Sequence, residues 1–335
     1  MDSKTSHSSR VLLVRNLSVT ITGSGPEIPA VREVDLSIDR GEFVALLGES
    51  GSGKSVTARA IMGLGDENTR VEADQLRLGD ADLLVLSEEA RRKLRGERMT
   101  LVLQDALSAL NPVMTIGDQI GEIFRVHRGA SRRQAHAQAV ELLGLVRIPA
   151  PSRRVNDYPH QFSGGMRQRI LIAMAIALDP ELLIADEPTT ALDVTVQAQI
   201  LDLLGTLRDQ LGMGVLLITH DLGVVMEVAD HVSVMYAGRI VESGDADTVF
   251  AHPAHPYTEA LLRSVPQAAQ RGSDLLTIPG SPPSLTRVPA GCSFHPRCDL
   301  AVTACATTRP PLTDTIPGRR VACLRSEEFT GELVS

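Results

Sequence analysis

The segment from Gly48 to Ser55 reads GESGSGKS and fits the phosphate-binding pattern G-x-x-x-x-G-K-[ST]. In this pattern the glycines let backbone N–H groups wrap the phosphates of a nucleotide, and the following helix adds the partial positive charge of its N-terminus. Lys54 is expected to reach the β- and γ-phosphates, and the Ser55 hydroxyl is expected to bind Mg²⁺. A flexible Gly/Ser loop is the alternative, but the apolar segment before the motif and the helical spacing after it favour the phosphate site. The expected phosphate-binding residues are Gly48, Ser50, Gly51, Gly53, Lys54, Ser55 and Val56.

An acidic pair, Asp186 and Glu187, ends the apolar segment ELLIADEP. At the end of a strand, Asp186 can bind Mg²⁺ through water, while Glu187 points elsewhere and can polarise a water for in-line attack on a γ-phosphate. Alone, such a pair can also be a solvated turn. Together with the loop at 48–55, it predicts a Mg²⁺-dependent nucleoside triphosphatase, a class that includes switches, kinases and motors.

Short apolar strands that alternate with helices are expected to position these residues, which predicts an α/β fold with a parallel sheet covered on both faces. The segment 230–245 is expected to form a hairpin that turns at Gly238. Expected strands are 11–21, 31–39, 42–48, 181–186 and 214–220, and expected helices are 55–64, 118–148, 164–177 and 196–211.

The segment FSGGMRQR, Phe162 to Arg169, resembles the signature sequence of ABC-type ATPases, with Phe where Leu is commoner. Read alone, SGG is a capped helix start, whose hydroxyl and N–H groups face an incoming phosphate. The resemblance implies that Ser163, Gly164 and Gly165 act in trans, on ATP held by the opposite subunit.

Other positions match the same family one at a time, and the resemblance covers about Val11 to Phe250. Gln104 resembles the Q-loop glutamine that contacts Mg²⁺ and water, and Asp193 resembles the D-loop aspartate at the dimer interface. His220 resembles the switch histidine that touches the γ-phosphate. Ile21 stands where the family often has an aromatic residue that stacks on adenine, and an aliphatic side chain loses that π-stacking. The implied catalytic set is Glu187, His220, Gln104 and Lys54, and the implied Mg²⁺ ligands are Ser55, Gln104 and Asp186.

The resemblance also implies a domain organisation. Residues 1–9 are expected to be a disordered tail, and residues 10–250 an ABC cassette of a P-loop NTPase. This cassette would have a parallel-sheet core, an antiparallel β subdomain and a helical signature subdomain at about 105–178. Residues 251–335 are expected to be a small metal-bearing C-terminal extension.

The tail contains HPYTEALLRSVP (255–266), IPGSPPSL (278–285) and GCSFHPRC (291–298). These strings resemble the C-terminal extension of oligopeptide and dipeptide importer ATPases. The resemblance implies a position on the cytoplasmic face of the membrane, bound to two transmembrane permease subunits that work with an external solute-binding protein. It also implies a second ABC ATPase, and we expect a related chain, giving a heterodimer, rather than a copy.

All four cysteines of the chain lie in this tail: Cys292, Cys298, Cys305 and Cys323. Their spacing, C-x5-C-x6-C-x17-C, departs from the C-x2-4-C pairs usual for structural zinc. Four thiolates can hold a [4Fe–4S] cluster, and the resemblance implies one at these positions. Zinc and reduced, unligated cysteines are the alternatives. We expect the cysteines to staple a proline-rich tail that is too poor in apolar residues to make its own core.

Composition excludes several other functions. The net charge of −8 and the 3% aromatic content argue against a nucleic-acid binder. The first ten residues are polar and predict no secretory signal, and the longest apolar run, Ile170 to Leu178, is too short to span a bilayer. The expected function is therefore ATP hydrolysis that powers import of di- or oligopeptides. The alternatives are import of nickel or another small solute, a soluble ABC ATPase acting on nucleic acid or the ribosome, and a regulatory scaffold subunit.

Overall fold

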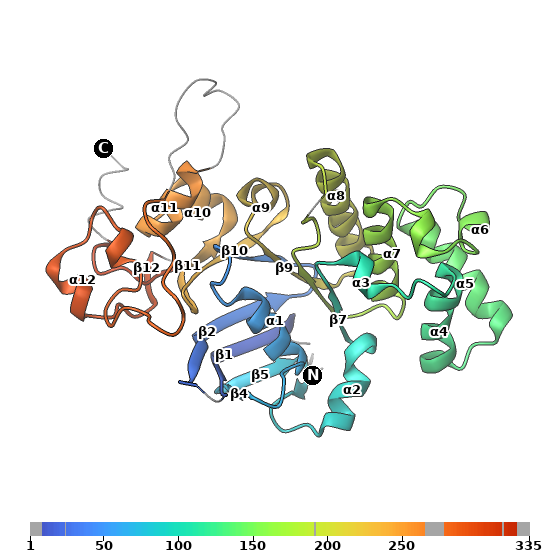
Figure 1. Cartoon of the computed structure of the whole chain (residues 1–335), viewed down its shortest axis with the longest axis horizontal. Helices are drawn as coiled ribbons and strands as arrows, with labels where there is room; N and C mark the ends of the chain where they lie inside the picture. The colour runs from blue at the N-terminus through green and yellow to red at the C-terminus, as the bar shows by residue number, and fades with distance from the viewer. Residues whose placement is uncertain (1–8, 24, 191, 265–277, 317, 327–335) are drawn as a thin grey trace, which may run out of the picture. The chain divides into compact units, whose positions relative to one another are not determined.

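A computed structural model describes residues 9–23, 25–190, 192–264, 278–316 and 318–326 (Figure 1). The chain divides into two compact units. One comprises residues 1–11, 39–42 and 85–217, and the other comprises residues 12–38, 43–84 and 218–335. Most of the N-terminal segment expected to be disordered, residues 1–8, lies outside the described part of the chain.

The unit that contains residues 12–38 has an antiparallel sheet in the order β2-β1-β5-β6, with β4 also paired to β1. Its long strand β1 buries Leu12 and Val14 on one face, as period-2 alternation predicts. The strands are β1 (Arg10–Ile21), β2 (Ile28–Asp39), β4 (Thr69–Glu72), β5 (Gln75–Leu78) and β6 (Ala81–Asp82).

A second sheet in the same unit runs in the order β12-β13-β11-β10-β3. All five residues of β3 are buried, and β3 is parallel to β10, which is the arrangement expected for a strand covered on both faces. The hairpin between β10 and β11 turns at Gly238, where φ is 83°, so this prediction is confirmed. The strands are β3 (Phe43–Leu47), β10 (His231–Tyr236), β11 (Arg239–Asp245), β12 (Thr313–Ile316) and β13 (Arg319–Val321). The helices are α1 (Lys54–Met62), α9 (Leu222–Val228), α10 (Ala246–Ala251), α11 (Pro256–Arg263), η2 (His295–Arg297) and α12 (Thr303–Thr307).

The other unit places strands in the order β9-β8-β7, with β7 parallel to β8, and its helices α4, α5 and α6 lie together in Figure 1. The helix expected from 118 to 148 is two helices, so this prediction was wrong. Gly129, at φ 63°, ends α4, and Ser131 starts α5 with a capping box. The strands are β7 (Met99–Val102), β8 (Leu182–Asp186) and β9 (Gly214–Thr219). The helices are α2 (Glu88–Glu97), α3 (Ala106–Ala109), α4 (Ile116–Arg128), α5 (Arg132–Leu145), α6 (Pro151–Arg154), η1 (Pro159–Gln161), α7 (Gly164–Ile176) and α8 (Val194–Leu211).

The C-terminal extension shares a core with the sheet that contains β3 and β10. Phe294, only 3% exposed, belongs to the same cluster as Leu47 and Tyr236, and Ile278 and Leu285 pack against that cluster. Apolar contacts with the cassette therefore anchor the tail. Within the described residues, the structure contains no helix long and apolar enough to cross a membrane.

Candidate functional site

The loop from Gly48 to Ser55 joins the buried end of β3 to the start of α1. Two of its glycines are required by close packing. A Cβ on Gly53, where φ is 107°, would lie 2.6 Å from the Ala30 carbonyl oxygen, and a Cβ on Gly48 would collide with the Met235 carbonyl oxygen. The backbone of the loop is thus a cradle that any side chain at these two positions would distort, which suits a phosphate-binding loop.

Lys54 is 5% exposed at the first position of α1. Its Nζ donates hydrogen bonds to the carbonyl oxygens of Gly48 at 2.7 Å and Glu49 at 3.0 Å. These bonds hold the ammonium over the loop, where the backbone N–H groups of the helix start are also concentrated. Ser50 and Gly51 are exposed on the loop, and Ser55 and Val56 are partly buried.

The acidic pair stands at the carboxyl end of β8, as predicted. Asp186 is 7% exposed, and the next residue, Glu187, has φ 48°, in the left-handed region that non-glycine residues rarely adopt. This backbone turns the Glu187 side chain away from the direction of the strand, and such strain is common at functional sites.

Gln104 and Glu187 are brought together by the structure. The Gln104 Nε2 donates to Glu187 Oε2 at 3.2 Å, and the Thr190 hydroxyl donates to the same oxygen at 2.9 Å. Two donors therefore orient the carboxylate. Because its nitrogen is turned to Glu187, the Gln104 amide has its carbonyl oxygen as the atom suited to a cation. Thr190 was not predicted as a site residue, and its position three residues after Glu187 in a turn was the available signal.

The signature residues lie at the start of α7 in the same unit as Glu187. The Ser163 side chain caps the helix by accepting from the Met166 N–H at 3.4 Å, and Ser163 and Gly164 are exposed. Phe162 is 3% exposed, with the Arg154 guanidinium 5.2 Å from its ring centroid, so the aromatic residue anchors the loop before the helix. A Cβ on Gly165 would lie 2.5 Å from Val196 Cγ1 on α8, so close helix packing excludes a side chain there.

The remaining predicted site residues lie at the ends of elements. Asp193 caps α8 by accepting from the Val196 N–H at 2.9 Å, and its side chain is exposed. His220 is exposed directly after β9, and Ile21 is the partly buried last residue of β1. Residues 48–56, His220 and Ile21 belong to one compact unit, whereas the other predicted nucleotide-site residues belong to the other unit.

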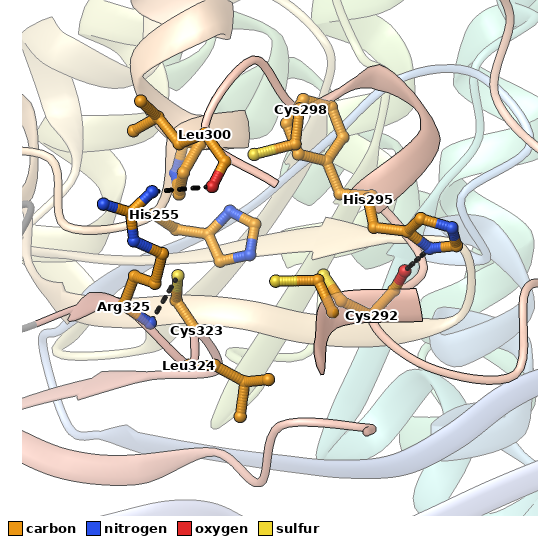
Figure 2. Close-up of a pocket in the computed structure, with 11 residues that line it drawn as sticks. His255, Cys292, His295, Cys298, Leu300, Cys323, Leu324 and Arg325 are labelled. Atoms are coloured by element: carbon orange, nitrogen blue, oxygen red, sulfur yellow. Dashed lines mark hydrogen bonds between the residues drawn. The ribbon is translucent and has the colours of Figure 1, made fainter. Parts of the chain in front are cut away.

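All four cysteines line one pocket (Figure 2), together with His255 and Phe294. In Figure 2 the thiols of Cys292, Cys298 and Cys323 point into the same space as the His255 ring, whereas the His295 ring turns away and bonds the Cys292 carbonyl oxygen at 2.8 Å. The structure therefore gathers thiols that are up to 31 positions apart, counted from 292 to 323.

The structure does not show the metal-bearing character that was predicted for the extension. Within the described residues, no group of three or more His, Cys, Asp or Glu side chains is arranged to hold a metal ion. The pocket has an internal volume of about 20 Å³, enough for one water molecule. Burial also raises the pKa of Cys292 and Cys323, and it raises that of Cys298 to about 11, so these thiols are neutral at pH 7. A metal would have to displace their protons.

Two protein families match the chain. "ABC transporter" matches residues 31–190, and "Oligopeptide/dipeptide transporter, C-terminal region" matches residues 241–305. A solved structure titled "Dimeric structure of a post-hydrolysis state of the ATP-binding cassette MJ0796 bound to ADP and Pi" is similar, with a TM-score of 0.63 and 28% identity. That similarity covers 70% of this chain and 98% of the other.

Curated relatives match over nearly the whole chain. BMEII0863 of Brucella melitensis, provisionally named a peptide import ATP-binding protein, is 51% identical over 331 residues, which cover 95% of this chain and 98% of the relative. The oligopeptide transport ATP-binding protein OppD of Mycobacterium tuberculosis is 50% identical over 325 residues, which cover 96% of this chain and 53% of OppD.

Proposed function

Because the chain belongs to the ATP-binding subunits of ABC importers for oligopeptides and dipeptides, we propose that Glu187 is the general base of its ATPase reaction. The observation that carries this proposal is the orientation of the Glu187 carboxylate. It follows a buried aspartate on a strained backbone and accepts hydrogen bonds from Gln104 and Thr190. A carboxylate fixed in this way can accept a proton from a water that attacks the γ-phosphate.

The other residues bind and orient the nucleotide. The loop at 48–55 surrounds the phosphates with backbone N–H groups, and Lys54 shifts its hydrogen bonds from the carbonyl oxygens of Gly48 and Glu49 to the β- and γ-phosphates. His220 contacts the γ-phosphate, and Ile21 covers the adenine. Ser55, Gln104 and Asp186 would hold Mg²⁺ through oxygen atoms, and the bound ion would neutralise phosphate charge.

Substitution of Glu187 by Gln tests the base. The amide keeps the shape of the side chain and accepts from Thr190, but it cannot take up a proton, so we expect ATP turnover to fall by about 10²–10⁴-fold. The measurement is phosphate release at saturating ATP, by the chain purified with its partner subunits. Binding of ATP should persist, and the variant should accumulate as an ATP-bound closed pair of ATPase subunits in gel filtration.

Glu181 provides a matched control at the other end of the same strand. It precedes β8 and pairs with Arg98 at 2.6 Å. The substitution Glu181→Gln also replaces a carboxylate by an amide on this strand but leaves the site intact, so turnover should stay within about two-fold of wild type. Equal turnover in the Glu187→Gln variant and the wild type would rule out Glu187 as the base.

We propose that two such ATPase subunits sandwich two ATP molecules, with Ser163, Gly164 and Gly165 of one subunit facing the nucleotide of the other and Asp193 at their interface. Exposure of Ser163, Gly164 and Asp193 supports this arrangement. The second subunit is a related chain, and the pair binds two permease subunits on the cytoplasmic face of the membrane. An external solute-binding protein delivers the peptide.

We also propose that Cys292, Cys298, Cys305 and Cys323 bind a [4Fe–4S] cluster, with a zinc ion as the alternative. The convergence of all four thiols on one pocket supports this proposal. The protein, purified without oxygen, should contain about four irons and four sulfides per chain and absorb visible light. Zinc in place of iron would support the alternative, and the absence of both would overturn the proposal.

A further inference from the structure

An arginine of the C-terminal extension contacts the phosphate-binding loop directly. Arg297, on η2, forms a two-pronged ion pair with Glu49, the second residue of the GESGSGKS motif. Its Nη1 lies 2.7 Å from Glu49 Oε2, and its Nη2 lies 3.1 Å from Oε1. The two residues are 248 positions apart in the chain. The general phosphate-binding pattern leaves the residue at position 49 unspecified, so the motif does not explain this pairing.

Arg297 is the buried partner of this ion pair, and it makes two further polar contacts besides those with Glu49. The Arg297 side chain is 6% exposed, its Nε donates to the Pro279 carbonyl oxygen at 2.8 Å, and its Nη1 lies 3.3 Å from the Tyr236 hydroxyl. Burial alone would lower the pKa of Arg297, but its hydrogen bonds to Glu49 and Tyr236 outweigh that effect and raise the pKa. A bidentate guanidinium–carboxylate pair in such surroundings fixes both position and orientation.

A second residue of the extension holds the backbone of the same glutamate. The Tyr257 hydroxyl, on α11, accepts a hydrogen bond from the Glu49 N–H at 3.0 Å. The Tyr257 ring is packed against Tyr236 and Phe294, with ring centroids 4.5 Å and 5.3 Å away, so the hydroxyl has little freedom to move. The carbonyl oxygen of Glu49, in turn, accepts from Lys54 Nζ. Glu49 is therefore held at its carboxylate and its N–H by the extension, and at its carbonyl by the phosphate-binding lysine.

From these contacts we infer that Arg297 and Tyr257 are positioning residues for nucleotide binding, and that the C-terminal extension sets the affinity of the phosphate-binding loop for ATP. The inference rests on the proposed role of this loop. Arg297 fixes Glu49, and Glu49 fixes the carbonyl oxygen to which Lys54 bonds. Loss of Arg297 frees the start of the loop, so ATP must then order a segment that the extension otherwise holds in place.

The test is the dissociation constant of the full-length chain for Mg²⁺-ATP, measured by titration calorimetry. We expect Arg297→Gln and Glu49→Gln each to weaken binding by about ten-fold or more. Glu49→Gln leaves the buried Arg297 charge without its partner, and Arg297→Gln leaves the partly buried Glu49 carboxylate unpaired. In the double variant the loss should be smaller than the sum of the two single losses, since both charges are gone. Tyr257→Phe removes one hydrogen bond and should weaken binding by about three- to ten-fold.

Arg309 is the matched control. Like Arg297, it is an arginine of the extension that pairs with a glutamate near the start of the chain, here Glu33 on β2. It contacts Glu33 at 2.7 Å and is largely exposed, and Glu33 is not part of the loop. The Arg309→Gln variant should bind ATP within about two-fold of wild type. In steady-state turnover, the Arg297→Gln variant should show a raised KM for ATP with kcat nearly unchanged, a split that general loss of folded protein would not produce.

Two outcomes separate the positioning role from the nucleotide site itself. Wild-type affinity in the Arg297→Gln and Tyr257→Phe variants, together with lost affinity in a Lys54→Ala variant, would overturn the positioning role alone. Wild-type affinity in the Lys54→Ala variant would overturn the loop as the nucleotide site. If Arg297→Gln does not fold, Glu49→Gln and Tyr257→Phe decide the question, because each changes only a few atoms and leaves the ring packing in place.

Discussion

His231 is a titratable side chain of the sheet that contains β3, where it pairs with Val44, at the end of β3 away from the nucleotide loop. It begins β10, and its Nε2 lies 3.0 Å from the Ser243 hydroxyl on β11. Burial lowers the pKa of His231, and the nearby Arg320 lowers it further, while Asp245 opposes the shift. The folded protein thus binds a proton at this site less readily than the unfolded chain, whose histidine titrates near pH 6.5.

The sign of the pH effect follows from this difference. Above about pH 6.5, His231 is neutral in both the folded and the unfolded state, and its contribution to the free energy of unfolding is fully present. Below that pH, the unfolded state takes up the proton first and is stabilised relative to the folded state. We expect the free energy of unfolding to fall by up to about 1.4 kcal/mol per pH unit between 6.5 and the folded pKa. Urea unfolding at pH 7.5, 6.5 and 5.5 measures it, and a His231→Gln variant should have a shallower slope by that amount. Parallel slopes in the two proteins would contradict the assignment.

Among the helices and strands, the continuous apolar strands were easy to predict. Phe43–Leu47 and Leu182–Asp186 are continuous apolar runs that end in turn or acidic residues, and both are completely buried strands. The break between α4 and α5 was missed because apolar spacing continues on both sides of it. The signal was Gly129 followed by Ser131, a helix stop and a new cap within three residues.

The packing of α7 on α8 imposes a requirement that the sequence pattern of a single helix does not reveal. From the sequence, Gly164 and Gly165 were both predicted to expose N–H groups to a phosphate. In the structure their surroundings differ, since a Cβ on Gly164 would have its nearest neighbour, Leu192 Cδ2, at an ordinary 3.5 Å, whereas Gly165 lies against Val196. The second glycine is therefore also a packing requirement, which depends on a helix some 30 positions away and is not visible in the local sequence.

At the scale of the whole chain, the nucleotide motifs were predictable because each occupies a few consecutive residues at the end of an element. Contacts between distant segments were not, and they include Gln104 on Glu187 and the extension on the phosphate loop. The extension was expected to depend on its cysteines because few of its residues are apolar. It also adds residues such as Phe294 to a core that it shares with β3, β10 and α9. No pattern within the tail specifies the surface it packs against.

This shared core predicts that the extension and the sheet unfold together. Phe294 is 3% exposed, with its ring centroid 5.3 Å from those of both Tyr236 and Tyr257. Replacement by Ala should lower the free energy of unfolding by about 3–5 kcal/mol, measured in urea, because it removes a buried ring and leaves a cavity. Val302→Ala, at a side chain of the extension that is 43% exposed, should change it by less than about 0.5 kcal/mol. Hydrogen exchange locates the effect: in the Phe294→Ala variant the amides of Phe43–Leu47 should lose protection along with those of the tail. Full protection of β3 beside an exchanging tail would mean that the extension unfolds as an independent unit, and its hold on the phosphate loop could then be released without unfolding the cassette.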